Sequence, residues 1–262
     1  MSDDELRMAP ELPVELHANG EKVAVLMCSP YNLDDLAVGH LVGRGMLTDR
    51  ATLMSVGACA DLRLATVIAP DGIHQDRYGL GVVVSSGCGS GPVFRTEASL
   101  PLLEGGPCIP LGELQLLARY MFDMAELYRE IGGMHCAALF VADTATGAAA
   151  EGLPAGHIVV REDVGRHNAV DKVIGYAFRN GWPLEQAVIL TSGRIAADMI
   201  LKAIAAGVRL LVSRSIPTST AYELAKATGL TLVGRIEKSR PVLYCSPERV
   251  GGQTPAAGPG GG

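Results

Sequence analysis

The segment that decides the fold reads AVILTSGRIAADMILKAIAAGVRLLVSRS and spans residues 187–215. Two short apolar runs, 187–191 and 208–213, enclose a stretch, 195–206, in which apolar residues recur at helical spacing. Short apolar runs bounded by polar turns are typical of buried strands, and the spacing of the middle stretch is typical of a helix. The segment therefore predicts a strand–helix–strand unit.

The same alternation extends in both directions along the chain. We expect additional strands at 137–143 and 156–161, helices at 166–179 and 218–228, and a closing hairpin formed by 231–236 and 241–245. Strands that alternate with helices favour an α/β layer with largely parallel strands. The core is therefore predicted to span residues 111–250.

The first part of the chain has a different pattern. Strands at 14–18 and 22–27 flank Asn19-Gly20, a dipeptide typical of a two-residue hairpin turn. A helix follows with Asn32 as its expected cap, and Asp34 and Asp35 complement its dipole. We expect further strands at 62–69 and 79–85, and a single helix over 112–131 that links two lobes.

These patterns divide the chain into two predicted folded parts. Residues 11–110 form a smaller α+β subdomain that carries a cysteine loop, and the α/β core follows it. The ends, residues 1–10 and 251–262, are polar or glycine-rich and are predicted to be disordered tails, because they hold too little apolar surface to offset their ordering entropy.

Composition restricts the class of protein. The 262 residues are 48% hydrophobic with a mean hydropathy of +0.25, and 28 acidic against 22 basic residues give a net charge of −6. No apolar run reaches the ~18 residues that a membrane span needs, and no bulk positive field recruits nucleic acid. The N-terminus lacks the pattern of a signal peptide, and the six cysteines show no regular spacing. We expect a cytoplasmic protein without disulfides, membrane association or nucleic-acid binding.

Three polar clusters follow predicted strands, where open α/β sheets bind their ligands. They are EDVGRHN at 162–168, Ser192-Gly193-Arg194 and Ser213-Arg214-Ser215. Helical N–H groups and arginine forks at such turns favour a phosphate or another anion. The alternative is ordinary helix capping by Asp163, Ser192 and Ser215. Three successive turns that carry arginine favour the anion site.

Cys88 lies in the glycine-rich stretch SSGCGSGP at 85–92. Backbone N–H groups of such a loop can stabilise a thiolate, which makes the cysteine a candidate nucleophile or sulfur carrier rather than inert packing. His135 follows Gly132-Gly133 and is more typical of a core histidine than of a base, whereas His167 is better placed for function.

Four motifs together resemble the formate dehydrogenase accessory sulfurtransferase family, FdhD. They are PYNLDDLAVG at 30–39, GGMH at 132–135, EDVGRHNAVDK at 162–172 and SGR at 192–194. The resemblance implies an α/β fold whose core is a cytidine-deaminase-like mixed sheet with helices on both faces. It also implies a sulfurtransferase that moves persulfide sulfur from a cysteine desulfurase to the molybdenum cofactor of formate dehydrogenase. A homodimer is expected.

The resemblance assigns roles to individual residues. Cys88 corresponds to the persulfide carrier, but Gly91 stands where the family commonly has a second cysteine, and Cys136 is a candidate stand-in. The cofactor, bis-molybdopterin guanine dinucleotide, is a bound substrate that GDP would mimic, and no catalytic metal is expected. The residues expected to bind it are Asp163, His167, Ser192, Gly193, Arg194, Arg235, Ile236, Glu237, Lys238, Ser239 and Arg240.

Two other functions compete with this assignment. A zinc-dependent deaminase requires His-x-Glu and Pro-Cys-x-x-Cys, whereas His135 is followed here by Cys136 and Ala137, so zinc hydrolysis is rejected. The second rival is a non-catalytic chaperone that binds the cofactor and docks the apoenzyme. The missing second loop cysteine leaves this alternative open.

Overall fold

A mixed six-stranded sheet forms the centre of the protein. The computed structural model describes residues 8–76, 100–142 and 152–251. The sheet has the order β11-β10-β9-β8-β6-β7. Its strands are β6 (His135–Ala142), β7 (Gly156–Asp163), β8 (Ala187–Thr191), β9 (Leu210–Ser213), β10 (Thr231–Gly234) and β11 (Val242–Cys245).

The prediction of largely parallel strands is wrong for this sheet. β8, β9 and β10 pair in parallel, but β6 is antiparallel to both β7 and β8, and β10 is antiparallel to β11. The mixture arises because β6 and β7 pair as a hairpin and β6 inserts between β7 and β8. As a consequence β7 points the same way as β8, β9 and β10, so the carboxyl ends of these four strands share one edge.

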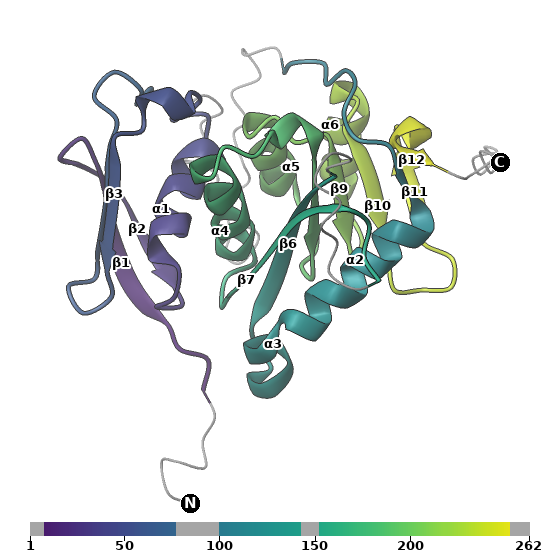
Figure 1. Cartoon of the computed structure of the whole chain (residues 1–262), viewed down its shortest axis with the longest axis horizontal. Coiled ribbons are helices and arrows are strands. Elements are labelled where there is room, and N and C mark those ends of the chain that lie inside the picture. The colour runs from purple at the N-terminus through teal and green to yellow at the C-terminus, as the bar shows by residue number, and fades with distance from the viewer. Residues whose placement is uncertain (1–7, 77–99, 143–151, 252–262) are drawn as a thin grey trace, which may run out of the picture.

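Helices cover both faces of this sheet (Figure 1). One face packs against α4 (Arg166–Arg179), α5 (Ala197–Ala205) and α6 (Ser219–Thr228), and the other packs against α2 (Leu111–Met124). Alternate residues of β6 point to the two faces. Leu139 packs in the core under α4, α5 and α6, and Phe140 packs in the core under α2. The expectation of helices on both faces is confirmed.

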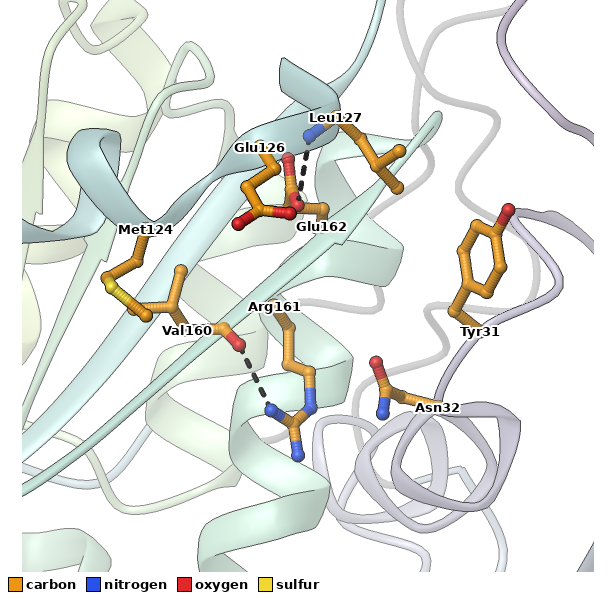
Figure 2. A pocket seen from close by; sticks show the side chains of 8 residues that line it. All are labelled: Tyr31, Asn32, Met124, Glu126, Leu127, Val160, Arg161 and Glu162. Carbon is orange, nitrogen blue, oxygen red and sulfur yellow. Dashed lines mark hydrogen bonds between the residues drawn. The ribbon is translucent and has the colours of Figure 1, made fainter. Parts of the chain in front are cut away.

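The single helix predicted over 112–131 is two helices, α2 and α3 (Glu126–Ile131). The break lies at Ala125, which is buried and has φ −85° and ψ 83°. The change of direction brings the first N–H groups of α3 to the carboxylate of Glu162, which accepts from Leu127 N at 3.3 Å and Tyr128 N at 2.6 Å. Figure 2 shows Glu162 next to Leu127. The sequence pattern missed the break because its apolar spacing continues through it.

A second, four-stranded sheet lies at the N-terminal side of the molecule (Figure 1), in the order β2-β1-β4-β3. The predicted Asn19-Gly20 turn is confirmed, with φ 51° and 87°. One face packs against α1, whose N-cap position is Asn32 as predicted, but the Asn32 side chain makes no capping hydrogen bond. The elements are β1 (Leu12–Ala18), β2 (Glu21–Cys28), α1 (Leu33–Val42), β3 (Ser55–Cys59) and β4 (Leu64–Ile68).

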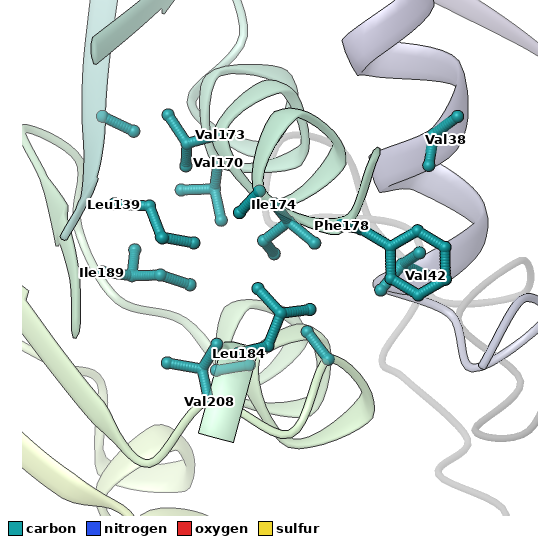
Figure 3. Packing of buried hydrophobic residues seen from close by; sticks show 14 of the residues in the cluster. Val38, Val42, Leu139, Val170, Val173, Ile174, Phe178, Leu184, Ile189 and Val208 are labelled. Carbon is teal, nitrogen blue, oxygen red and sulfur yellow. The ribbon is translucent and has the colours of Figure 1, made fainter. Parts of the chain in front are cut away.

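The two sheets are joined by a close crossing of α1 and α4. A Cβ atom on Gly39 would lie 1.7 Å from the Asp171 carbonyl oxygen, and one on Gly175 would lie 1.9 Å from that of Asp35. Only glycine permits this backbone contact. Figure 3 shows Val42 of α1 beside Phe178 of α4 at the same contact.

Residues 100–110 pack against the core rather than the small sheet. Arg249 is buried and donates to Leu103 O at 2.6 Å and Gly229 O at 2.7 Å. The predicted domain boundary at 110 and both predicted tails stay predictions.

The short elements are β5 (Ile109–Pro110), β12 (Val250–Gly251), and 3-10 helices at Arg50–Thr52, Leu184–Gln186 and Pro247–Arg249. No helix in the described part of the chain has the length and apolar character to cross a bilayer.

Candidate functional site

The polar clusters predicted from the sequence meet at the shared carboxyl edge of the sheet. Each of the four strands that point this way is followed within three residues by an arginine. Arg166 is half-buried, and the other three are exposed. We call the set Arg166, Arg194, Arg214 and Arg235 the arginine edge. Its forks of N–H donors match phosphate or carboxylate ligands.

Backbone contacts hold the loops of the arginine edge side by side. Arg214 N donates to Thr191 O at 3.1 Å, and Arg235 N donates to Ser215 O at 3.0 Å. The Ser213 hydroxyl donates to Gly193 O at 2.7 Å. The predicted turn Ser192-Gly193-Arg194 is therefore fixed against the end of β9, and Arg194 points out from it as an exposed side chain.

Helix capping does not explain these polar clusters. α5 begins only at Ala197, with no side-chain cap, so Ser192 does not cap it. α6 is capped by Thr218 rather than by Ser215. The capping alternative is therefore wrong for both serines. The late start of α5 also means that its first N–H groups do not lie at the Ser192-Gly193-Arg194 turn, so the exposed hydrogen-bond donors there are those of the Arg194 side chain.

The Ser192 hydroxyl contacts His135 instead of capping a helix. Its hydroxyl lies 3.3 Å from His135 Nδ1 and accepts the Cys136 N–H at 3.0 Å. Burial lowers the pKa of His135, and the nearby charges of Arg166 and His167 lower it further. Burial and the neighbouring positive charges therefore favour the uncharged form of the His135 ring.

Asp163 is wholly buried rather than open to a ligand. Its carboxylate pairs with Lys172 Nζ at 2.6 Å and accepts from Ser29 N at 3.0 Å and Gly165 N at 2.8 Å. These partners occupy both oxygens. The structure gives Asp163 a positioning role, because it fixes the turn that leads into α4.

His167 stands in that turn, on the first residues of α4. Its Nε2 lies 3.1 Å from the carboxylate of Asp198 at the start of α5. Burial raises the pKa of Asp198, but the pairing with His167 outweighs it, so the carboxyl pKa lies below its ordinary value. The pair links α4 to α5 beside Arg166.

The hairpin turn 235–240 lies at the same edge, after β10. The side chains of Arg235, Glu237, Lys238, Ser239 and Arg240 are exposed, as a binding role requires. Ile236 differs, because its side chain is buried among the core residues below α2. Gln115 of α2 donates to Ile236 O and Lys238 O, both at 3.2 Å, which fixes the turn. The predicted cofactor segment is therefore rigidly attached, with Ile236 as its anchor.

Arg214 lies at the arginine edge, although the predicted binding set did not include it. Its guanidinium contacts the Tyr128 hydroxyl and the Glu237 carboxylate and lies 5.4 Å from the centre of the Phe122 ring. The signal was present in the sequence, since Arg214 directly follows a predicted strand. Its partners Tyr128 and Phe122 come from α3 and α2 and could not be inferred from local pattern.

The cysteines differ in accessibility. Cys88, the predicted sulfur carrier, lies outside the described residues. Cys136 has no exposed surface, and burial raises the pKa of its thiol to about 12. A buried, protonated thiol is a poor nucleophile. The structure therefore argues against Cys136 as a stand-in for the missing loop cysteine.

Two cavities in the described part of the chain lie away from the predicted cofactor residues. The first has a volume of about 250 Å³. It lies between α3, β7 and the segment before α1, and Figure 2 shows the side chains that line it. It is lined by Tyr31, Asn32, Met124, Glu126, Leu127, Val160, Arg161 and Glu162. The second, of about 300 Å³, lies between α1 and β3. Among the described residues, no group of three or more His, Cys, Asp or Glu side chains is arranged to hold a metal ion.

The fold is a three-layer α/β arrangement with four arginines along one edge of its central sheet. Comparison with known proteins gives the family. The model of the FdhD/NarQ family matches residues 9–251, and the chain belongs to this family.

Two relatives named sulfur carrier protein FdhD illustrate the match. The one from Streptomyces coelicolor is 34% identical over 93% of this chain and 88% of its own length, and the one from Methanothermobacter thermautotrophicus is 32% identical over 95% of each. A crystal structure from Desulfotalea psychrophila, provisionally described as a formate dehydrogenase accessory protein, superposes with a TM-score of 0.68. It is 25% identical and covers 92% of this chain and 88% of its own.

Proposed function

We propose that this protein is a sulfur carrier that serves formate dehydrogenase. In this proposal it accepts persulfide sulfur from a cysteine desulfurase on Cys88 and passes it to the molybdenum cofactor before the cofactor enters the enzyme. The observation that carries the proposal is the family match across residues 9–251, within which Cys88 stands between glycines. The relatives' printed name, sulfur carrier protein, supports the class of activity.

The first transfer step is a thiol exchange that needs no redox partner. The Cys88 thiolate attacks the outer sulfur of the desulfurase persulfide, its S–S bond breaks, and the desulfurase cysteine leaves as a thiolate. Cys88 then holds the sulfur as a persulfide. One cysteine suffices for this step, so glycine at position 91 does not prevent it.

The second substrate in this proposal is bis-molybdopterin guanine dinucleotide. Its phosphates carry several negative charges, and the arginine edge with the turn 235–240 offers exposed guanidinium and ammonium groups within one rigid surface. Arg194, Lys238 and Arg240 are the groups expected to contact phosphate, and GDP is the expected mimic. His135 and Ser192 lie at the same edge, where a neutral imidazole can hold or release a proton.

The proposal extends to the setting of the protein. The core is taken to be cytidine-deaminase-like. In this proposal its edge binds an anionic cofactor and does not carry out the zinc chemistry of the deaminases. The protein is taken to act in the cytoplasm as a homodimer.

A cofactor-binding chaperone is the second candidate function. Gly91 in place of a second cysteine favours it, because the arginine edge alone would suffice to bind and deliver the cofactor. The two candidates share the cofactor site and differ only in whether Cys88 carries sulfur.

Intact-mass spectrometry separates these candidates. The full chain is incubated with a cysteine desulfurase and cysteine, and its mass is compared before and after treatment with a thiol reductant. A sulfur carrier gains sulfur that the reductant removes. A chain that never gains sulfur, while the desulfurase loads a known acceptor in the same assay, would contradict the proposal and favour the chaperone.

A further inference from the structure

An ion pair at the arginine edge joins Arg214 to Glu237. Arg214 follows β9, and its Nε faces the carboxylate of Glu237 in the turn after β10. The other charged side chains of that turn, Arg235, Lys238 and Arg240, are basic. Glu237 is thus the acidic member of a basic turn, and it faces an arginine rather than water alone.

The Arg214 guanidinium is held in place before any ligand arrives. Its Nη1 contacts the Tyr128 hydroxyl, and its Cζ lies 5.4 Å from the centre of the Phe122 ring. Tyr128 is in turn fixed, because its backbone N donates to Glu162 at 2.6 Å. An arginine that is already oriented loses little side-chain entropy when it binds a planar or tetrahedral anion.

The ion pair itself is partly exposed. The side chain of Arg214 is 49% exposed and that of Glu237 is 37% exposed. Exposed ion pairs are weak, because water competes for both charges. A phosphate that offers two acceptors to the same fork makes stronger charge-assisted bonds. Exchange of the Glu237 carboxylate for a phosphate is therefore favourable at Arg214.

We propose that Arg214 is a phosphate-binding residue for a nucleoside diphosphate and that Glu237 is its resident counter-ion, which the ligand displaces. The inference rests on the proposed function and adds a binding residue to its cofactor site. Glu237 then acts as a selectivity element: it holds the arginine oriented while the site is empty, and it repels weak anions that cannot replace it.

The backbone of the turn allows this exchange without unfolding. Gln115 holds the carbonyls of Ile236 and Lys238, and Ile236 N donates to Ser213 O at 3.1 Å. The backbone around Glu237 thus stays attached to α2 and β9. Only the Glu237 side chain has to rotate for its carboxylate to leave Arg214.

Calorimetric titration with GDP tests the exchange on four proteins: the parent chain, Glu237→Gln, Arg214→Gln and the double variant. Glu237→Gln is expected to tighten GDP binding about two- to fivefold, the range of an exposed ion pair. Arg214→Gln is expected to weaken it about tenfold or more. In the double variant the gain from Glu237→Gln should disappear, because the two side chains act through one contact.

Controls exclude a general charge effect. Glu21→Gln and Arg63→Gln make the same charge changes on the small sheet, and both should leave GDP affinity unchanged. Guanosine, which lacks phosphates, should not distinguish Glu237→Gln from the parent. Circular dichroism checks that each variant is folded.

The outcomes separate this inference from the function on which it rests. If the parent chain fails to bind GDP, the nucleotide site of the proposed function is wrong and this inference with it. If the parent binds GDP but Arg214→Gln binds as tightly, or Glu237→Gln gives the same gain with and without Arg214, the site stands and the exchange is refuted.

Discussion

The interior around α4 and the arginine edge use charged residues in opposite ways. Around α4 the charges are paired and mostly buried: Lys172 pairs with Asp163, and Lys202 pairs with Asp171. The buried Asp35 of α1 pairs with the partly exposed Arg161 and Arg179. At the edge, three of four arginines are exposed, and the acid that faces them is the partly exposed Glu237.

The difference shows what burial does to a charge. Removing one partner of a buried pair leaves an uncompensated charge away from water, so such pairs fix a single arrangement of the elements. Exposed arginines keep their donors solvated and available, so they can exchange water or a weak counter-ion for a phosphate. The buried pairs therefore hold α4 against its neighbours, whereas the exposed arginines of the edge carry no such structural role.

The largest expected effect is at the buried Lys172–Asp163 pair. Lys172→Met leaves Asp163 buried without its cation, and we expect unfolding in urea to lose about 3–5 kcal/mol of stability. Lys226→Met, an exposed position on α6, is the matched control and should change stability by less than about 0.5 kcal/mol. Equal losses of unfolding free energy in the two variants would show that the buried pair stabilises the protein no more than an exposed lysine does.

The close helix crossing gives the next effect. Gly39→Ala places a methyl group 1.7 Å from the Asp171 carbonyl oxygen, so α1 and α4 must separate. We expect a loss of about 3 kcal/mol, the upper part of the overpacking range. Gly57→Ala on β3, where a Cβ meets nothing within 4 Å, is the control. A thermal melt of Gly39→Ala that coincides with the control would contradict the crossing as described.

The edge is expected to affect binding rather than stability. Arg194→Ala and Arg240→Ala each remove one charge-assisted hydrogen-bond donor, so GDP affinity should fall by about 1.5–3 kcal/mol, or roughly tenfold or more. The unfolding free energy should stay unchanged, since both side chains are exposed. Affinities equal to that of the parent would place the site elsewhere.

The smallest effect concerns acid. The lowered pKa of Asp198 means that its pairing with His167 stabilises the protein above the ordinary carboxyl pKa of about 4. That stability is lost as the pH falls through the lowered folded-state pKa. Asp198→Asn should remove this part of the acid loss, about 0.5–1 kcal/mol, because the pair is only partly buried. Urea unfolding at pH 6 and pH 3 measures it, and identical pH dependence in parent and variant would refute the pairing.

Local pattern predicted most of the fold. α4 and β8 have the bounds that the sequence pattern predicts, and the hairpin β10–β11 and the helices on both faces are confirmed. The direction of β6 and the break at Ala125 were missed, because both depend on partners distant in sequence. The apolar spacing of 112–131 continues through Ala125, and only Glu162 on β7 explains why the chain turns there.

The site was predictable in part for the same reason. Strand ends mark ligand turns, so Ser192, Arg194 and the turn 235–240 could be found from the sequence, and so could Arg214. Burial could not: Asp163 and Ile236 look like their exposed neighbours in the sequence but face the interior. The isolated glycines of α1 and α4 were a signal for the helix crossing, since glycine is unfavourable inside a helix without a packing reason.

The central claim, that Cys88 carries sulfur, is tested most directly by comparing two cysteine variants. Cys88→Ala and Cys136→Ala are each incubated with a cysteine desulfurase and cysteine, and sulfur gain is read from the intact mass. The account predicts that Cys88→Ala gains no sulfur and keeps the melting temperature of the parent, whereas Cys136→Ala still gains sulfur. Full sulfur loading of Cys88→Ala, with loading lost in Cys136→Ala, would contradict it.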